Sequence, residues 1–329
     1  MNLPIGVVAL ALIARTLHES FHRREARIDG AGAALLLLAL GLLIFGVLEG
    51  GQRWPWASWP VALVFALAAL AVAALVTVER HAAEPVLPGW LWRRPELLGS
   101  NLAAIGMGLV MMAPSVFLPT FLQSVQSLGA IAAGLVLAAI SMGWPAASAL
   151  SPPLWARLGF RDAGLGGCVL ILLSSLAFLW MPRPQPVALV FLDQILLGAG
   201  LGFFSTPILV GMQSTVDWGR RGVVTGSHMF SRYLGQSLGA ALFGAIFNAT
   251  LGAYLAAAPQ ALAARLPADV DAVIGALHSP ATDTAVAGDL RSGIGVATDE
   301  LYVGMSVIAA LMLLVLLIAP RRFPVLEEK

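Results

Sequence analysis

Eight long apolar runs divide this chain, and each is long enough to cross the hydrocarbon core of a lipid bilayer. That core is about 30 Å thick, which a helix crosses with roughly 20 apolar residues. With 59% hydrophobic and 11% charged residues, the chain cannot be an ordinary soluble domain. The sequence therefore predicts an all-α, polytopic membrane helical bundle. The predicted spans are Gly30–Leu48, Trp59–Val78, Leu97–Leu122, Leu128–Leu150, Ala163–Met181, Val187–Met212, Val223–Thr250 and Leu301–Pro320.

Basic residues collect in alternate gaps between these spans. Four lie in one set of gaps, at positions 53, 183, 265 and 291, and Arg232 lies inside a span. Because cytoplasmic loops are enriched in Lys and Arg, the richer set of gaps is predicted to be cytoplasmic. This orientation places the carboxyl terminus inside, in a multi-pass protein of the plasma membrane (the bacterial inner membrane). The predicted cytoplasmic residues are Arg15, Arg23, Arg24, Arg27, Arg80, Arg93, Arg94, Arg157, Arg161, Arg220, Arg221, Arg321, Arg322 and Lys329.

The spacing of the spans predicts three regions. Residues 1–29 hold an apolar stretch followed by a cytoplasmic loop. As a helix the apolar stretch is about 21 Å long, which is too short to cross the bilayer. We expect that stretch to be the inner end of a truncated helix. Residues 30–96 hold two central linker helices and a cytoplasmic connector. Residues 97–329 hold a six-helix unit with a long outer loop at 251–300, whose amphipathic pieces, such as Ala268–Leu277, are expected at the surface.

One face of the span Val223–Thr250 carries two basic residues and two glycines. Their spacings of four, three and four place them on one side of a helix: His228, Arg232, Gly235 and Gly239. A charged side chain inside a membrane normally faces protein or a wet cavity, and a Gly-x-x-x-Gly pair lets another backbone approach. We therefore expect the basic pair to face the interior, as candidates for the substrate cavity, and the glycines to form a helix contact.

The span Val187–Met212 carries a carboxylate near its outer end. Asp193 and Gln194 are followed by glycines that include Gly198 and Gly202. This Gly-x-Gly-x-Gly run lies inside an apolar helix with no strand before it, so it indicates close helix packing and not a nucleotide site.

Two roles stay open for Asp193. If consecutive spans are neighbours, its level in the membrane brings it within reach of Arg232 as a buried ion-pair partner. Alternatively, it carries a proton during transport, because an ionised carboxylate inside a membrane is costly.

The rest of the composition excludes several classes of protein. The single cysteine, Cys168, allows no disulfide framework and no thiolate metal site, and within a span it is interpreted as a small buried apolar residue. No basic patch for nucleic acid appears. We find no nucleophile–base pair, metal-ligand cluster or phosphate loop, so we expect no enzyme activity, no metal and no cofactor.

Short motifs stand in a recognisable order along the chain. Asn2-Leu3-Pro4-Ile5-Gly6 comes first, and Arg27-Ile28-Asp29-Gly30-Ala31-Gly32 follows. Further on stand Glu84-Pro85-Val86-Leu87, Leu118-Pro119-Thr120-Phe121-Leu122-Gln123, Ala133-Gly134-Leu135, and Arg221-Gly222 with Gly226, Arg232, Gly235 and Gly239. Together these motifs resemble helix six through helix fourteen of the fourteen-helix drug:proton antiporter group of the major facilitator superfamily.

The resemblance implies that residues 97–329 form the complete carboxyl-terminal half of a transporter. It also implies that the amino-terminal half, from helix one to helix five, is missing and required. In the cytoplasmic loop that resembles a family signature, Arg157, Gly159 and Arg161 match, but Ala156 stands where the family usually has Asp. A conformational latch is therefore not expected there.

These observations favour a membrane transporter that exports hydrophobic or cationic drug-like compounds in exchange for protons by alternating access. Its expected partners are the lipid bilayer, a small-molecule substrate and protons. Two alternatives stay open: a non-transporting fragment or partner-dependent half, and an uptake carrier for a small metabolite. Intramembrane acids favour a cationic substrate and clustered bases an anionic one, and the spans hold both kinds of residue.

Overall fold

The computed structural model describes residues 2–16, 29–50, 53–82, 85–258, 270–278 and 283–326. Within these ranges the backbone is helical apart from turns, short links and one bridge between Gly50 and Trp54. Eight of the described helical segments are long and apolar enough to cross a membrane. The predicted all-α, polytopic membrane fold is confirmed.

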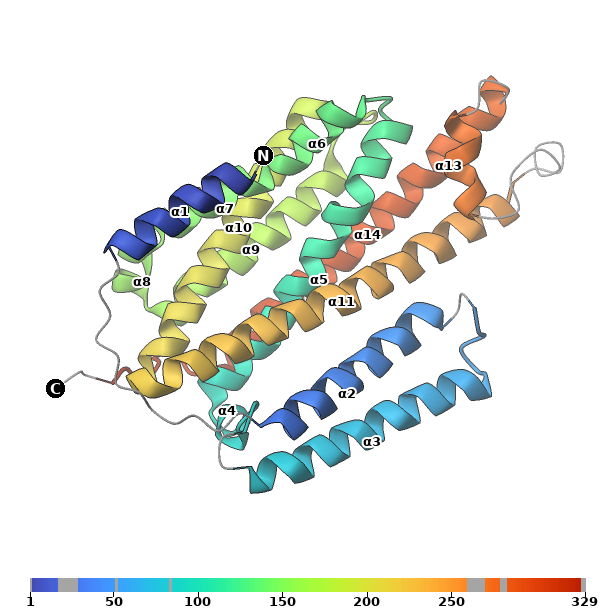
Figure 1. Ribbon diagram of the computed structural model, residues 1–329. Helices are drawn as coiled ribbons and strands as arrows, with labels where there is room; N and C mark the ends of the chain where they lie inside the picture. Colours follow the sequence, from blue (N-terminus) through green and yellow to red (C-terminus); the bar gives the residue numbers. More distant parts are fainter. Residues whose placement is uncertain are drawn as a thin grey trace.

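The helices follow the predicted spans closely, and Figure 1 shows their arrangement. They are α1 (Asn2–Thr16), α2 (Gly30–Glu49), α3 (Trp59–His81), α4 (Gly89–Arg93), α5 (Pro95–Ser124), α6 (Ala130–Ala138), α7 (Ile140–Leu150), α8 (Pro152–Leu158), α9 (Phe160–Trp180), α10 (Val187–Ser214), α11 (Trp218–Ala256), α13 (Val270–His278) and α14 (Thr284–Ile318).

The last span begins earlier than the sequence predicts. α14 starts at Thr284, inside the region expected to be an outer loop, and not at Leu301. Asp283 caps this helix, because its carboxylate accepts a hydrogen bond of 3.2 Å from the Ala285 amide. The added turns bury a residue every three or four positions, which packs them against the bundle. The buried positions before Leu301 are Val286, Leu290, Gly293, Ile294, Gly295, Ala297 and Thr298.

The predicted span Leu128–Leu150 is divided into α6 and α7 at Ala139. The Ala139 amide donates to the Val136 carbonyl at 3.2 Å, which is a three-residue step in place of the usual four. The short α8 then lies between α7 and α9, and it ends at Gly159, whose φ of 90° favours glycine.

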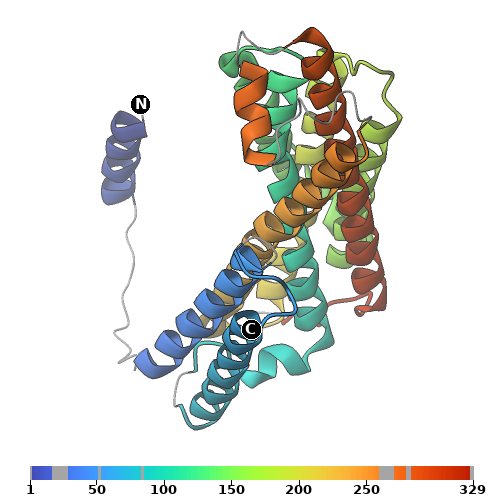
Figure 2. The ribbon, with the colours of Figure 1, turned by 90° about the vertical axis from the view of Figure 1, so that its right-hand side faces the viewer.

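The helices pack in two sets that α14 joins. α5 packs mainly on α11 and α14, α10 packs mainly on α9 and α7, and α14 also packs along α9. α2 and α3 form a hairpin beside α11, with α2 next to it in both views (Figures 1 and 2). Figure 2 shows α1 standing apart from the other helices.

Candidate functional site

The first turns of α10 hold a buried carboxylate, Asp193, which is 4% exposed. Ser174 of α9 donates to its Oδ1 at 2.9 Å, and Gln194 donates through Nε2 to its Oδ2 at 2.9 Å. Gln194 Nε2 also donates to the Tyr302 hydroxyl of α14 at 3.3 Å. Groups from three helices therefore form a buried polar cluster around the carboxylate, and the described residues that donate hydrogen bonds to it, Ser174 and Gln194, are neutral.

Close packing of α9 on α10 positions this cluster. A Cβ added at Gly200 would lie 2.9 Å from the Ile171 amide nitrogen, and one added at Gly167 would lie 2.7 Å from the Gly200 carbonyl oxygen. Glycine at both positions lets the two backbones approach this closely. Phe178 stacks on the Tyr302 ring with centroids 3.7 Å apart, which holds the tyrosine that meets Gln194.

A shallow apolar cleft of about 450 Å³ borders Asp193 where α9 ends and α10 begins. Asp193 is the one ionisable side chain among the described residues that line it. The other side chains that shape it include Trp180, Met181, Leu189 and Leu192. The carboxylate is therefore buried, but it lies next to an opening between the end of α9 and the start of α10.

The ion pair considered between Asp193 and Arg232 is not formed. The ion pairs among the described residues join Arg161 and Arg321 to Asp162, and Arg183 to Asp299. The physical reason is the packing order, because α10 packs on α9 and α7 whereas α11 packs on α5 and α14. Near Asp193, the helix that follows α10 in the chain is not its main neighbour.

Arg232 and His228 lie instead beside α5. His228 is 1% exposed, and Arg232 is partly exposed, with its guanidinium carbon 5.0 Å from the centroid of the Tyr233 ring. The His228 Nδ1 and Arg232 Nε atoms are buried without a hydrogen-bond partner among the described residues. His228 is therefore buried beside α5 and Arg232 is partly buried there, and neither pairs with a described carboxylate.

A group of hydrogen-bonded polar side chains lies next to this pair, and the sequence analysis did not predict it. Asn101 of α5 donates through Nδ2 to Ser227 Oγ at 3.4 Å, and Ser231 Oγ donates to Asn101 Oδ1 at 3.2 Å. All three side chains are buried. The spacing of Ser227 and Ser231, four residues apart on the face of His228, is the signal that could have revealed it.

Gly235 and Gly239 face α5. A Cβ added at Gly235 would lie 2.8 Å from the Ile105 carbonyl carbon, and one added at Gly239 would lie 2.9 Å from the Leu109 Cα. Neither position has room for a side chain unless a helix moves.

Gly198 and Gly202 face α7 in the same manner. A Cβ added at Gly198 would lie 3.0 Å from the Ile140 Cα, and one added at Gly202 would lie 3.0 Å from the Ser148 amide nitrogen. Gly200, which lies between them in the run, faces α9 instead. The glycines of the run therefore contact two different helices in turn. The contacts on both sides are to helix backbones.

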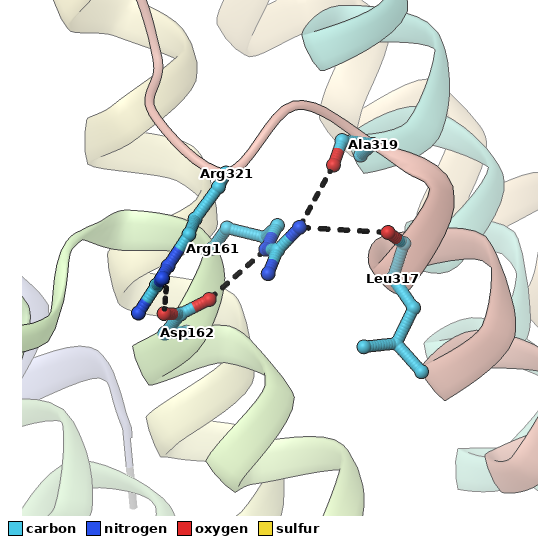
Figure 3. A network of polar contacts seen from close by, with 5 residues as sticks. All are labelled: Arg161, Asp162, Leu317, Ala319 and Arg321. Carbon is cyan, nitrogen blue, oxygen red and sulfur yellow. Dashed lines mark hydrogen bonds and ion pairs between the residues drawn. The ribbon is translucent and has the colours of Figure 1, made fainter.

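The turn between α8 and α9 contains the loop residues that the sequence singled out. Arg157 is exposed at the end of α8, and Arg161 donates to Asp162, which is the carboxylate that the sequence analysis missed. Figure 3 shows that Arg321, which follows α14, donates to the same carboxylate. Asp162 in the first turn of α9, and not position 156, therefore supplies the acidic group of this turn.

Comparison with known proteins identifies the family. A family model described as Major Facilitator Superfamily matches residues 8–240. The chain belongs to the major facilitator superfamily, which is a family of membrane transporters and not of enzymes.

Several curated relatives carry drug-resistance names. The chain is 26% identical over 240 residues to the multidrug transporter protein MdtP of Bacillus subtilis. The aligned region covers 71% of this chain and 43% of the relative. It is 26% identical to multidrug resistance protein 3 of Bacillus subtilis, covering 72% of this chain and 46% of the relative. It is 31% identical over 211 residues to a tetracycline resistance determinant of Streptomyces rimosus, covering 64% of this chain and 60% of the relative.

These relatives confirm the resemblance to the drug antiporter group. The chain spans less than half the length of the two Bacillus relatives. Among solved structures, a bacterial homologue of the human lysosomal transporter Spinster matches with a TM-score of 0.47 and 16% identity, over 85% of this chain and 64% of that one.

Proposed function

We propose that this chain forms the carboxyl-terminal helical half of an exporter that exchanges protons for hydrophobic or cationic drug-like compounds. The names of the relatives, which include multidrug and methylenomycin resistance proteins, support export of such compounds. In transporters built from two related halves, the substrate site lies near the bilayer midplane, and access alternates as the halves move about it. The proposal includes a bacterial inner-membrane location with the carboxyl terminus in the cytoplasm, which the positions of the basic residues support.

The environment of Asp193 is the observation that carries the proton-coupling part of the proposal. A buried carboxylate inside a membrane is costly when it is ionised without a cation, and the donors to Asp193 are the neutral groups of Ser174 and Gln194. A carboxylate in such surroundings that also borders a cleft is suited to accept a proton and release it. Gln194 and Tyr302 would keep the side chain in place in both protonation states.

A second set of helices is part of this proposal. Residues 97–329 would supply one wall of the transport path, and an amino-terminal half would supply the other. The support is the length of the Bacillus relatives, of which this chain covers 43% and 46%. We propose that transport requires both halves, so that the chain alone would be a partner-dependent half.

One observation favours a second candidate, which is a carrier for a small anionic metabolite. His228 and Arg232 lie one helical turn apart, and neither has an ion-pair partner among the described residues. An unpaired guanidinium that is partly exposed inside a bundle is suited to bind a carboxylate or phosphate of a substrate. In that case, Arg232→Gln would abolish transport of the anion, and the unmodified chain would not export a lipophilic cation.

The test uses everted membrane vesicles from a bacterial strain without its own drug exporters. The vesicles contain the chain alone, or the chain together with the amino-terminal half of MdtP. Ethidium and tetracycline serve as probes, and an imposed pH gradient drives the transport. We expect transport only with both halves present, and we expect Asp193→Asn to abolish it because an amide exchanges no proton.

Asp217→Asn is the matched control, because it makes the same chemical change at an exposed residue whose side chain makes no capping bond. It should transport both probes like the unmodified chain. Gradient-driven transport by Asp193→Asn at the unmodified rate would exclude the proton-carrier role. Transport by the chain alone would instead contradict the need for a second half.

A further inference from the structure

A basic cleft opens at the end of the bundle where α9 begins and α14 ends. Its volume is about 430 Å³, and it is formed by the turn between α8 and α9 and by the chain that follows α14. Gly159 in this turn has open space where a Cβ would stand, so no side chain from this position fills the cleft. Three arginines and two phenylalanines line it: Arg157, Arg321, Arg322, Phe160 and Phe323.

A single carboxylate orients two arginines at this end of the bundle. Arg161 Nε and Arg321 Nε each lie 3.0 Å from an oxygen of Asp162, as Figure 3 shows. Arg161 Nη1 also donates to the carbonyl oxygens of Ala319 at 3.1 Å and Leu317 at 3.4 Å, so it caps the end of α14. The Arg321 side chain donates to described residues through Nε alone and is 75% exposed. Its terminal nitrogens therefore make no hydrogen bond to a described residue and are open to solvent.

The described residues that line the cleft include three arginines and no carboxylate. Arg157 and Arg322 are both exposed, and neither forms an ion pair with a described residue. Together with Arg321 they bring three guanidinium groups to the cleft, and of these three only Arg321 pairs with a described carboxylate, that of Asp162. A guanidinium binds phosphate oxygens through paired hydrogen bonds, so the excess charge is suited to a phosphate group.

Apolar side chains beside the cleft identify the kind of phosphate. Leu158 is 52% exposed, Leu317 is 54% exposed and Ile318 is 86% exposed. Leu158 ends α8 and lines the cleft, and Leu317 and Ile318 end α14, a few residues before Arg321 and Arg322 of the cleft. Free phosphate would make no use of such a surface, whereas the acyl chains of a phospholipid would cover it.

We propose that this cleft binds the headgroup of an anionic phospholipid. The phosphate lies among Arg157, Arg321 and Arg322, and the acyl chains lie along Leu317 and Ile318. This site is distinct from Asp193 and from the basic pair of α11, and it does not depend on which compound the protein transports.

The test measures lipid binding to the purified full chain in a nonionic detergent by native mass spectrometry. The probes are dioctanoyl phosphatidylglycerol, dioctanoyl phosphatidylcholine and sodium phosphate. Each basic residue near an anionic lipid contributes about fivefold to binding. We therefore expect the unmodified chain to prefer phosphatidylglycerol, and the double variant Arg157→Gln, Arg322→Gln to bind it about 25-fold more weakly. Arg80→Gln, an exposed arginine at the end of α3, is the control and should bind it like the unmodified chain.

Other outcomes would overturn the proposal. Equal affinity of the unmodified chain for the two lipids would refute it without the use of any variant, and so would an equal loss of binding in Arg80→Gln. Displacement of phosphatidylglycerol by millimolar sodium phosphate would show a site for free phosphate and would also overturn it. The substituted arginines are exposed and unpaired with described residues, so the double variant should keep the melting temperature of the unmodified chain.

Discussion

Gly235→Ala is expected to push α11 away from α5. The added Cβ would lie 2.8 Å from the carbonyl carbon of Ile105 and 2.9 Å from its Cα. Carbon atoms in contact are normally about 3.5–4.0 Å apart. The methyl group therefore lacks about 0.7–1.2 Å of space, and the atoms that it meets belong to a helix backbone and not to a side chain that can rotate away.

The helices have to separate locally to make this space. On the facing helix, a Cβ at Gly108 would lie 2.7 Å from the Gln236 amide nitrogen, so the contact is tight from both sides. Overpacking a close contact costs about 1–3 kcal/mol, and we expect a loss of that size in the free energy of unfolding. The separation also moves Ser231 relative to Asn101, so the hydrogen bond of 3.2 Å between them should lengthen.

The assay is thermal unfolding of the purified protein in detergent, combined with the yield of monodisperse protein. The matched control is Gly244→Ala, which adds the same methyl group to the same helix at a position where a Cβ meets nothing within 4 Å. Gly235→Ala should lower the melting temperature and the yield, whereas Gly244→Ala should lower neither. If the two variants unfold at the same temperature, the close approach of α5 and α11 does not contribute to stability as reasoned here.

Three other predictions concern orientation and polar contacts. A cysteine at position 283 should react with an impermeant thiol reagent in intact cells and one at position 221 should not; strong labelling at 221 would reverse the proposed orientation. Asp162→Asn should reduce stability by more than the about 0.2–1 kcal/mol of one exposed ion pair, because it removes the exposed pair with Arg321 and also the pair with Arg161, whose side chain is 14% exposed. This is measured by thermal unfolding, and no change would mean that Asp162 does not hold the arginines. Asn101→Ala should cost about 0.6 kcal/mol for each hydrogen bond lost between α5 and α11, and an unchanged melting temperature would contradict this.

The spans were predictable because hydrophobic length is a local property of the sequence. A run such as Val187–Met212 has to be helical within a membrane, since no water is available to bind its backbone groups. The ends of helices were less predictable where a helix extends beyond the apolar run. The first turns of α14 contain Asp289 and Arg291 and read as a polar loop, yet the cap at Asp283 and the buried positions behind it make them helical.

The neighbours of each helix could not be read from one sequence. The interpretation of Asp193 as a partner of Arg232 assumed that helices consecutive in the chain lie side by side. The glycine pattern pointed to close packing at Gly235, but it did not show that Gly108 of α5 was on the other side. Asp162 was overlooked for a similar reason, because its second partner, Arg321, lies after the last helix.

The separation of the two polar clusters limits how a proton at Asp193 could influence a substrate near Arg232. α10 does meet α11 through a hydrogen bond of 2.8 Å between Gln213 and Thr225. That contact lies about 30 Å along α10 from Asp193, at 1.5 Å per residue. Much nearer to Asp193, the hydroxyl of Tyr302 joins the carboxylate cluster to α14, which packs on α5 and α11. Any coupling between the two clusters is therefore expected to pass through a shift of α14 and not directly from α10 to α11.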